Sequence, residues 1–449
     1  MAAGGGIRSG RGRHNEAALR VSRRIVRDVF GPAERRGFAV RYWDGLREDS
    51  GSGGPGVELV LRSPWSLRRA FLPPTEAAMG RAYAAGDVDV EGDLERVVDM
   101  AERARGRLRR PRVLAGTLAR LLRLPAPADP ADDAAGAAGS RLRGRRHSPS
   151  RDAAAVRSHY DIGNAFFRLF LDRRMVYSCA YFPAGGEDLD EAQEMKLDHI
   201  CRKLRLGPGE RFLDVGCGWG ALVIHAAERY GVVAIGITLS EAQATLARER
   251  IAAAGLGDRC EVRVMDYREL PADGHYDKVA SIGMVEHVGA ARLPEYFRAV
   301  TGALRPGGLF LNHGIVSLQP ARSGNRRRRR RPAARTSFIQ RYVFPDGELL
   351  PPADTIAPAE AIGLELRDLE SLREHYARTL RLWVRRLEEH RAEAVAAAGP
   401  ETYRVWRLYM AASARLFARG DIGVVQALWG KPLPDGSLPL PPTRADLYT

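Results

Sequence analysis

The sequence is poor in cysteine and has no long apolar segment. Its four cysteines form no CxxC pair and have no histidine-rich run beside them, so neither a metal site nor a disulfide framework is expected. No stretch reaches the roughly 18 consecutive apolar residues of a membrane-spanning helix. The Gly/Arg-rich start, Met1 to His14, lacks the apolar core of a secretory signal. We therefore expect a cytoplasmic protein that is soluble or attached peripherally to a membrane.

Positive charge is abundant instead. The formal net charge is +15 and the isoelectric point is near 10.1, so the protein should be attracted to polyanionic surfaces. Six consecutive arginines, Arg326 to Arg331, must be solvated, because so much like charge cannot be buried. The chain has no recognisable nucleic-acid-binding module. We therefore expect the partner to be an anionic membrane surface at the inner face of the membrane, and no nucleic acid.

The 449 residues are too many for one small core, and changes in composition suggest where the chain divides. Short alternating runs, AVRYWDG and VELVLRS, followed by a helical stretch from Leu67 to Leu94, predict a small α+β domain. The expected divisions are a basic flexible tail at 1–28, the α+β domain at 29–124, a Pro/Ala-rich linker at 125–151, a larger domain at 152–432 and a C-terminal tail at 433–449.

The larger domain alternates apolar strands with helix-length segments. Its predicted strands are RFLDVGCG, VVAIGIT, EVRVMD, YDKVASIGM and GLFLNHGIV, in that order. Strands separated by helices predict an α/β fold with a doubly wound, Rossmann-like parallel sheet.

A glycine-rich turn follows the first of these strands. In DVGCGWG, Asp214, Gly216, Gly218 and Gly220 let the backbone turn tightly and approach a ligand. A dinucleotide site would favour an acidic residue at the end of the next strand, yet that strand ends in Thr238. The pattern is therefore less typical of NAD binding than of methyltransferases, where an acid after the third strand contacts adenine. Asp266 and Asp214 are the candidate acids, and a turn-capping role for Asp266 stays open.

Five further strings carry a resemblance to a known family. They are VRSHYDIGNAFFRLFLDRRMVYSCAYF at 156–182, ITLSEAQ at 237–243, SIGMVEHVG at 281–289, FIQRYVFPDGELLP at 338–351 and HYARTLRLW at 375–383. In this order they resemble the cyclopropane-fatty-acyl-phospholipid synthases and mycolic acid methyltransferases, which use S-adenosylmethionine. The N-terminal domain is similar to the extra domain of the full-length bacterial synthases, which implies lipid presentation or packing in a homodimer.

The resemblance implies a set of cofactor contacts. The matching residues are Tyr177, Ser178, Asp214, Gly216, Cys217, Gly218, Gly220, Thr238, Leu239, Ser240, Gln243, Asp266 and Tyr267. Gln243 could then replace the missing ribose carboxylate.

The implied chemistry is attack of a cis alkene of a phospholipid acyl chain on the sulfonium methyl, which needs a dry, apolar pocket. The resulting carbocation must lose a proton to close a cyclopropane ring. The family uses bound bicarbonate as this base, held by groups that match Cys179, Glu286, His313, Ile315 and Tyr376. The rings of Tyr177, Phe182 and Tyr342 are candidate shields for the cation.

Each site residue also has an ordinary structural interpretation. Glu286 could cap a helix, His313 could be a satisfied core histidine, and Cys179 could be a small buried hydrophobe. The stripe of Tyr376, Leu380, Trp383 and Leu387 is expected to be mostly packing. Many bacterial synthases carry a cysteine where this chain has Ser413, and we expect the serine to be tolerated because the chemistry needs no protein nucleophile.

Other functions stay open at this point. Loss of a different proton would give a methylene or methyl branch in place of the ring. A small-molecule methyltransferase would need neither the basic surface nor the acyl-pocket strings. A non-catalytic lipid-binding protein would tolerate loss of Glu286 and His313, which are both present.

Overall fold

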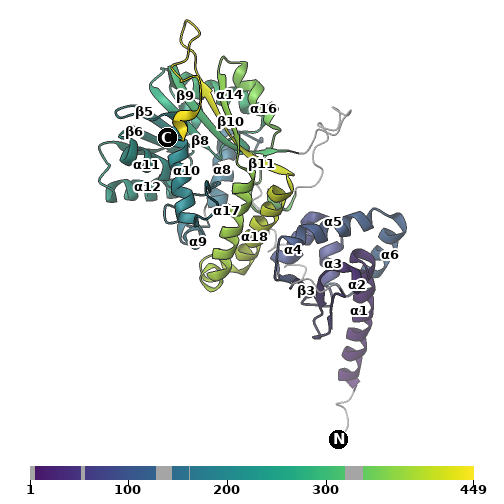
Figure 1. Cartoon of the computed structure of the whole chain (residues 1–449). Helices are drawn as coiled ribbons and strands as arrows, with labels where there is room; N and C mark the ends of the chain where they lie inside the picture. Colours follow the sequence, from purple (N-terminus) through teal and green to yellow (C-terminus); the bar gives the residue numbers. More distant parts are fainter. Residues whose placement is uncertain (1–5, 52–55, 128–143, 161, 319–336, 449) are drawn as a thin grey trace. The chain divides into compact units, whose positions relative to one another are not determined.

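The computed structural model describes residues 6–51, 56–127, 144–160, 162–318 and 337–448 (Figure 1). Arg326 to Arg331 and most of the expected linker at 125–151 lie outside these ranges. The chain forms two compact units. The first contains Met1–Ser140, Arg331–Val343 and Gly399–Arg415, and the second contains Arg141–Arg330, Phe344–Ala398 and Leu416–Thr449. The sequence suggested two continuous domains, whereas each unit combines segments that are distant along the chain.

The first unit has a four-stranded sheet in the order β2-β1-β3-β4. Strand β1 pairs parallel with β3, whereas β1–β2 and β3–β4 are antiparallel. The strands are β1 (Ala39–Arg41), β2 (Arg47–Glu48), β3 (Glu58–Leu61) and β4 (Val88–Glu91), and the helices are α1 (Gly6–Phe30), α2 (Ala33–Arg36), α3 (Ser66–Phe71), α4 (Glu76–Ala84), α5 (Arg96–Leu108), α6 (Pro111–Leu121) and α15 (Phe338–Tyr342).

Two expectations for this unit are wrong. The tail expected at 1–28 is helical from Gly6, because Ser22, Ile25, Val26 and Val29 recur at helical spacing and are fully buried. The helical stretch expected from Leu67 to Leu94 is instead α3, α4 and then β4. A turn separates α4 from β4, and the alternating sequence VDVE then pairs with β3.

The last contribution to the first unit comes from α18 (Arg391–Arg419), a helix shared by both units. Gly399 interrupts α18 with a φ of 82° and is followed by Pro400. Within the first unit, Arg407 donates to the Tyr83 hydroxyl at 3.0 Å, and Arg415 pairs with Asp99 at 3.0 Å. Residues 399–415 are therefore part of the first unit's own structure.

The second unit has a seven-stranded sheet in the order β10-β11-β9-β8-β5-β6-β7. Strands β5 to β9 pair in parallel and β11 runs antiparallel to both neighbours, which confirms the expected doubly wound α/β fold. The strands are β5 (Arg211–Val215), β6 (Val233–Thr238), β7 (Cys260–Val264), β8 (Tyr276–Ile282), β9 (Leu304–Ser317), β10 (Glu365–Ser371) and β11 (Ile422–Gly430).

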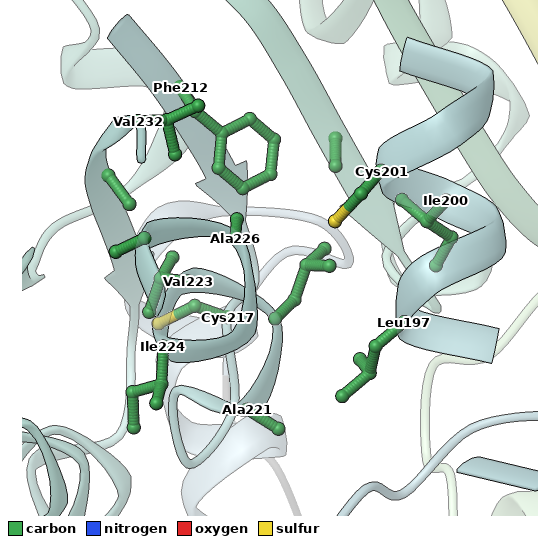
Figure 2. Packing of buried hydrophobic residues seen from close by; sticks show 14 of the residues in the cluster. Leu197, Ile200, Cys201, Phe212, Cys217, Ala221, Val223, Ile224, Ala226 and Val232 are labelled. Atoms are coloured by element: carbon green, nitrogen blue, oxygen red, sulfur yellow. The ribbon is translucent and has the colours of Figure 1, made fainter. Parts of the chain in front are cut away.

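Two apolar cores hold helices against this sheet. The first core joins the sheet to α10 (Leu189–Leu204), α11 (Ala221–Tyr230) and α12 (Glu241–Ala253), and Figure 2 shows Leu197, Ile200 and Cys201 of α10 together with residues of β5 and α11. The second core packs α14 (Leu293–Ala303) and α16 (Pro352–Glu360) against it. The remaining helices are α8 (Pro149–Tyr160), α9 (Asn164–Arg168), α13 (Val285–Val288) and α17 (Arg373–Glu389).

The C-terminal segment differs from the sequence expectation. The run YRVWRLYMAASARLFARGDIGVVQ reads as one helix, but the helix ends at Gly420, which adopts a left-handed conformation with a φ of 75°. The following residues form β11, which lies between β9 and β10. Beyond it, Leu447 is buried and Asp446 pairs with Arg205 at 2.7 Å, so part of the expected tail at 433–449 packs on the second unit.

Among the described residues, none of the helices has the length and apolarity needed to cross a bilayer.

Candidate functional site

A cavity lies at the carboxyl ends of β5, β6 and β8, where the glycine turn meets the start of α11. Gly216 has a φ of 86°, and a Cβ placed on it would lie 2.4 Å from Cγ of Met284. Only glycine fits this position without displacing Met284. The lining is largely apolar and comprises Val156, Tyr160, Val215, Gly216, Gly218, Ile237, Thr238, Leu239, Gln243, Met265, Tyr267, Ile282, Gly283, Met284 and His287.

The turn between β6 and α12 is fixed by three side chains. Ser240 is the N-cap of α12, and its hydroxyl accepts from the backbone N–H of Gln243 at 3.3 Å. Thr238 donates its hydroxyl proton to Gln243 Oε1 at 2.7 Å. With its Oε1 occupied, Gln243 presents its amide NH₂ group as the donor that remains for a ligand.

Asp266 is already engaged with its own turn. Its carboxylate accepts from the Arg268 backbone N–H at 3.0 Å and from the Arg268 guanidinium at 3.3 Å. Arg268 also pairs with Asp152 of α8 and lies 4.9 Å from the ring centroid of Tyr267. The neighbours Met265 and Tyr267 line the cavity, whereas Asp266 does not. The turn-capping role left open for Asp266 is therefore present.

Asp214, the last residue but one of β5, carries a buried carboxylate. Burial raises its pKa to about 7, opposed by the charge of Lys196. Within the described ranges, Oδ1 of Asp214 has no hydrogen-bond partner. Lys196 of α10 is also buried and donates to the Ser178 hydroxyl at 2.9 Å. An acid without a full set of partners beside a buried cation indicates a site that takes a polar group.

The predicted cofactor residues divide into two sets. Gly216, Gly218, Thr238, Leu239, Gln243 and Tyr267 line the cavity. The others are not part of its lining: Tyr177, Ser178, Asp214, Cys217, Gly220, Ser240 and Asp266. The Cys217 side chain points into the apolar core with Val223 and Ile224 (Figure 2), so only its backbone is available to a ligand.

The structure brings Glu286, His313 and Ile315 together. Glu286 of α13 accepts a 2.6 Å hydrogen bond from the backbone N–H of Ile315, and burial raises the pKa of Glu286 to about 7. His313 lies two residues before Ile315 on β9, so their side chains share one face of the strand. Among the described residues, neither Glu286 Oε2 nor His313 Nε2 has a hydrogen-bond partner.

His313 is held as a neutral imidazole. Burial lowers its pKa to about 3, with a further contribution from the charge of Lys196. The side-chain Nε2 of Gln426 on β11 lies 3.3 Å from His313 Nδ1. If that amide donates to Nδ1, then Nε2 carries the proton and is a buried donor.

Cys179 and Tyr376 form a second group. The Cys179 sulfur lies 3.7 Å from the Leu372 carbonyl oxygen, which also accepts from the Tyr376 backbone N–H at 3.1 Å. Burial raises the pKa of Cys179 far above its usual range, so the thiol stays protonated. Lys196 is close enough to both Cys179 and His313 to affect their pKa values. Among the described residues, no hydrogen bond or ion pair joins the Cys179 side chain to Glu286, His313 or Ile315.

The candidate cation shields differ in their surroundings. The ring of Tyr177 stacks on Trp383 at a centroid distance of 5.2 Å within an aromatic cluster. The face of Phe182 is already covered by the Arg378 guanidinium at 4.2 Å, and Tyr342 belongs to the first unit. One face of the Phe182 ring is therefore occupied by a guanidinium.

Sequence reasoning missed several residues of the site. Val156 and Tyr160 of α8 and Met284 and His287 near α13 line the cavity. All four lie in the sequence strings that carried the family resemblance, but no role was predicted for them. Lys196 gave no signal, because one lysine in a polar helix looks solvated. In the described ranges, no group of three His, Cys, Asp or Glu residues could hold a metal ion.

Comparison with known families identifies both parts of the chain. The family described as mycolic acid cyclopropane synthetase matches residues 147–427, and a domain of unknown function (DUF7884) matches residues 25–110.

Relatives with related names cover nearly the whole chain. A probable fatty acid methyltransferase of Pseudomonas putida is 40% identical over 91% of this chain and 95% of its own length. A second, Rv3720 of Mycobacterium tuberculosis, is 38% identical over 94% of this chain and 98% of its own. Cyclopropane mycolic acid synthase 1 of the same species is 36% identical over 61% of this chain and 95% of its own.

Solved structures agree with this assignment. The cyclopropane synthase MmaA2 of Mycobacterium tuberculosis is 33% identical with a TM-score of 0.57, and covers 64% of this chain and 100% of its own. The mycolic acid cyclopropane synthase CmaA1, complexed with SAH and CTAB, is 34% identical with a TM-score of 0.56, over 62% of this chain and 97% of its own. These findings confirm the resemblance seen in the sequence. The chain belongs to the mycolic acid cyclopropane synthetase family of S-adenosylmethionine-dependent methyltransferases.

Proposed function

We propose that this enzyme transfers a methylene group from S-adenosylmethionine to the cis double bond of an unsaturated phospholipid acyl chain and forms a cyclopropane fatty acid. It would act as a peripheral enzyme at the inner face of the membrane. The observation that carries the proposal is that Glu286 Oε2 and His313 Nε2 are two buried polar atoms with no hydrogen-bond partner among the described residues. Burying such polar atoms costs free energy unless a ligand forms hydrogen bonds with them.

The cavity beside the glycine turn fits the cofactor. Gly216 leaves space that a Cβ would fill against Met284, and the carboxylate of Asp214 has an oxygen available for the methionine end. Gln243 can donate to the ribose hydroxyls, and Tyr267 supplies an aromatic wall. When bound, S-adenosylmethionine supplies an electrophilic methyl group. The apolar lining excludes water, which would otherwise capture a cation on the acyl chain.

The group around Glu286 suits a small oxyanion that accepts the proton, and we propose bicarbonate. His313 would donate from Nε2, and its neutral state at physiological pH preserves one donor and one acceptor. Glu286, with a pKa near 7, can donate or accept at Oε2 while Ile315 fixes its other oxygen. Cys179 and Tyr376 would complete the site with a neutral thiol and a phenol hydroxyl. Because the Ile315 N–H is already occupied, Ile315 would act by orienting Glu286.

Expression in a host that makes unsaturated phospholipids but has no such enzyme tests this function. Mass spectrometry should show acyl chains that have gained one CH₂ and resist hydrogenation, because a ring has no double bond. A Glu286→Gln, His313→Ala double variant serves as the inactive control. If hydrogenation reduces the product that has gained one CH₂, the product carries a methylene branch and not a ring. Unchanged lipids, with folded protein that binds the cofactor, would favour a non-catalytic lipid-binding protein and refute the proposal.

A further inference from the structure

The elbow formed by α5 and α6 in the first unit concentrates positive charge. From Arg96 to Arg123 the chain has nine arginines against Asp99 and Glu102, a net charge of +7 in 28 residues. Nearly half of the net charge of the whole protein therefore lies on about one sixteenth of its length.

The arginines at the turn of the elbow are exposed and poorly compensated. Arg109, Arg110 and Arg112 form no ion pair with any carboxylate in the part of the chain that the structure describes. Arg105 lies 3.6 Å from Glu76, but both side chains are about half exposed, so this pair contributes little. The guanidinium groups are thus free to pair with external anions.

Apolar side chains lie among these arginines. Leu114, Leu118 and Leu122 follow one another at four-residue spacing along α6 and form a ridge that turns outward. Leu114 and Leu118 are half-buried, and Leu122 is 62% exposed. Thr117 and Leu121, which lie on the adjoining side of α6, and Leu124 just after the helix are buried. Leu122 is therefore exposed although its helix is fixed in place.

A hollow of about 230 Å³ opens beside this ridge. Phe71, Met79, Leu108 and Leu114 line it together with the charged residues Glu76, Arg105 and Arg109. An apolar hollow with guanidinium groups in its lining has the layout of a site for an acyl chain below a phosphate headgroup.

We propose that the α5–α6 elbow is the surface by which this enzyme docks on an anionic phospholipid membrane. Amphipathic helices that lie in a bilayer interface combine an apolar ridge with flanking basic residues, which is the arrangement of α6. A second copy of the chain is disfavoured, because a twofold interface would bring the same arginines face to face. A nucleic acid would pair with the arginines but would leave the leucine ridge and the hollow unused. The inference deepens the proposed function, on which it rests, by naming the surface that meets the lipid.

Flotation of the full-length protein with vesicles tests the docking surface. The probes are vesicles of pure phosphatidylcholine and vesicles with one third phosphatidylglycerol, at low and high salt. Arginines near an anionic membrane each strengthen binding by roughly a factor of five, so replacing Arg109, Arg110 and Arg112 with glutamate should weaken binding to the anionic vesicles by roughly 100-fold or more. Leu122→Ser should weaken it by several-fold and leave the salt dependence in place.

A matched control reverses the same amount of charge elsewhere. Arg229, Arg259 and Arg298 are exposed arginines of the second unit, and replacing them with glutamate should change binding by no more than about threefold through the loss of net charge. Wild-type binding that is equal on both kinds of vesicle, or equal losses in the two triple variants, would overturn the proposal. A change from dimer to monomer in the α5–α6 variant would assign the surface to a second copy and would also overturn it.

Cofactor binding and turnover on detergent-dispersed lipid separate this inference from the proposed function. The α5–α6 variants should keep both, because none of their substitutions lies in the cavity of the second unit. If the wild-type protein floats as described but never modifies lipid, the proposed chemistry fails and the docking surface stands. If it modifies dispersed lipid but ignores anionic vesicles, the docking surface fails and the chemistry stands.

Discussion

Replacing Glu286 with glutamine keeps the shape of the side chain and removes its ability to ionise. The 2.6 Å hydrogen bond from Ile315 can persist, because the glutamine carbonyl oxygen accepts as the carboxylate does. What changes is the free energy of holding a charge in a buried site. Burial raises the pKa of Glu286 from an ordinary value of 4.5 to about 7, so the folded protein binds this proton more tightly than the unfolded chain does.

The sign of the effect on stability follows from this difference. Between pH 4.5 and 7 the folded state holds a proton that the unfolded state has released, so the wild-type protein loses stability as the pH rises through this range. Above pH 7 both states are ionised and the loss is complete. The two pKa values give a loss of about 2–3 kcal/mol between pH 5 and pH 8. Glu286→Gln lacks this loss and should gain stability relative to wild type by that amount.

Urea denaturation of both proteins at pH 5, 6, 7 and 8 measures the difference directly. The free energy of unfolding of Glu286→Gln minus that of wild type should grow with pH and level off above pH 7. Other buried acids, Asp214 among them, contribute equally to both proteins and cancel. A difference that stays constant with pH would show that Glu286 has an ordinary pKa. In the same variant, turnover should fall by roughly 100-fold or more if Glu286 takes part in proton transfer.

Three further substitutions test other candidate residues. Lys196→Met should raise the pKa of Asp214 above its present value of about 7. Calorimetry should then show weaker S-adenosylmethionine binding, with the largest loss at neutral pH and the smallest at pH 9. An equal loss of affinity at the two pH values would contradict the interaction between Lys196 and Asp214. Gly216→Ala should reduce cofactor affinity by more than tenfold, because its Cβ would overlap Met284, and unchanged affinity would rule out a cofactor at this turn. Ser413→Cys should leave turnover within twofold, and a large gain would show that a thiol matters after all.

The fold could be predicted wherever local pattern and tertiary structure agree. Strands β5 to β9 are apolar runs between helical segments, and each was expected where it lies. Strand β10 was missed because its sequence, ELRDLES, is charged and occupies a sheet edge with only one partner strand. Strand β11 was missed because only Gly420 and Asp421 separate it from a long helix. Its extended conformation depends on pairing with β9 and β10, which no local pattern reveals.

The candidate site shows the same limit. Residues at strand ends and in the glycine turn could be predicted from the sequence, since their positions follow from the order of the strands. The burial of Lys196 could not be predicted, because its neighbours Ser178 and Asp214 come from separate segments of the chain. The difference between Thr238, which lines the cavity, and Asp266, which is tied to Arg268, also depends on side-chain geometry that spacing alone cannot give.

The path of α18 has a consequence for how the protein is made. Residues 399–415 belong to the first unit, yet they leave the ribosome after almost all of the second. The first unit therefore reaches its full set of residues only after residues 399–415 have been synthesised. For the same reason, a cut between the two matched families would separate Arg407 and Arg415 from their partners Tyr83 and Asp99.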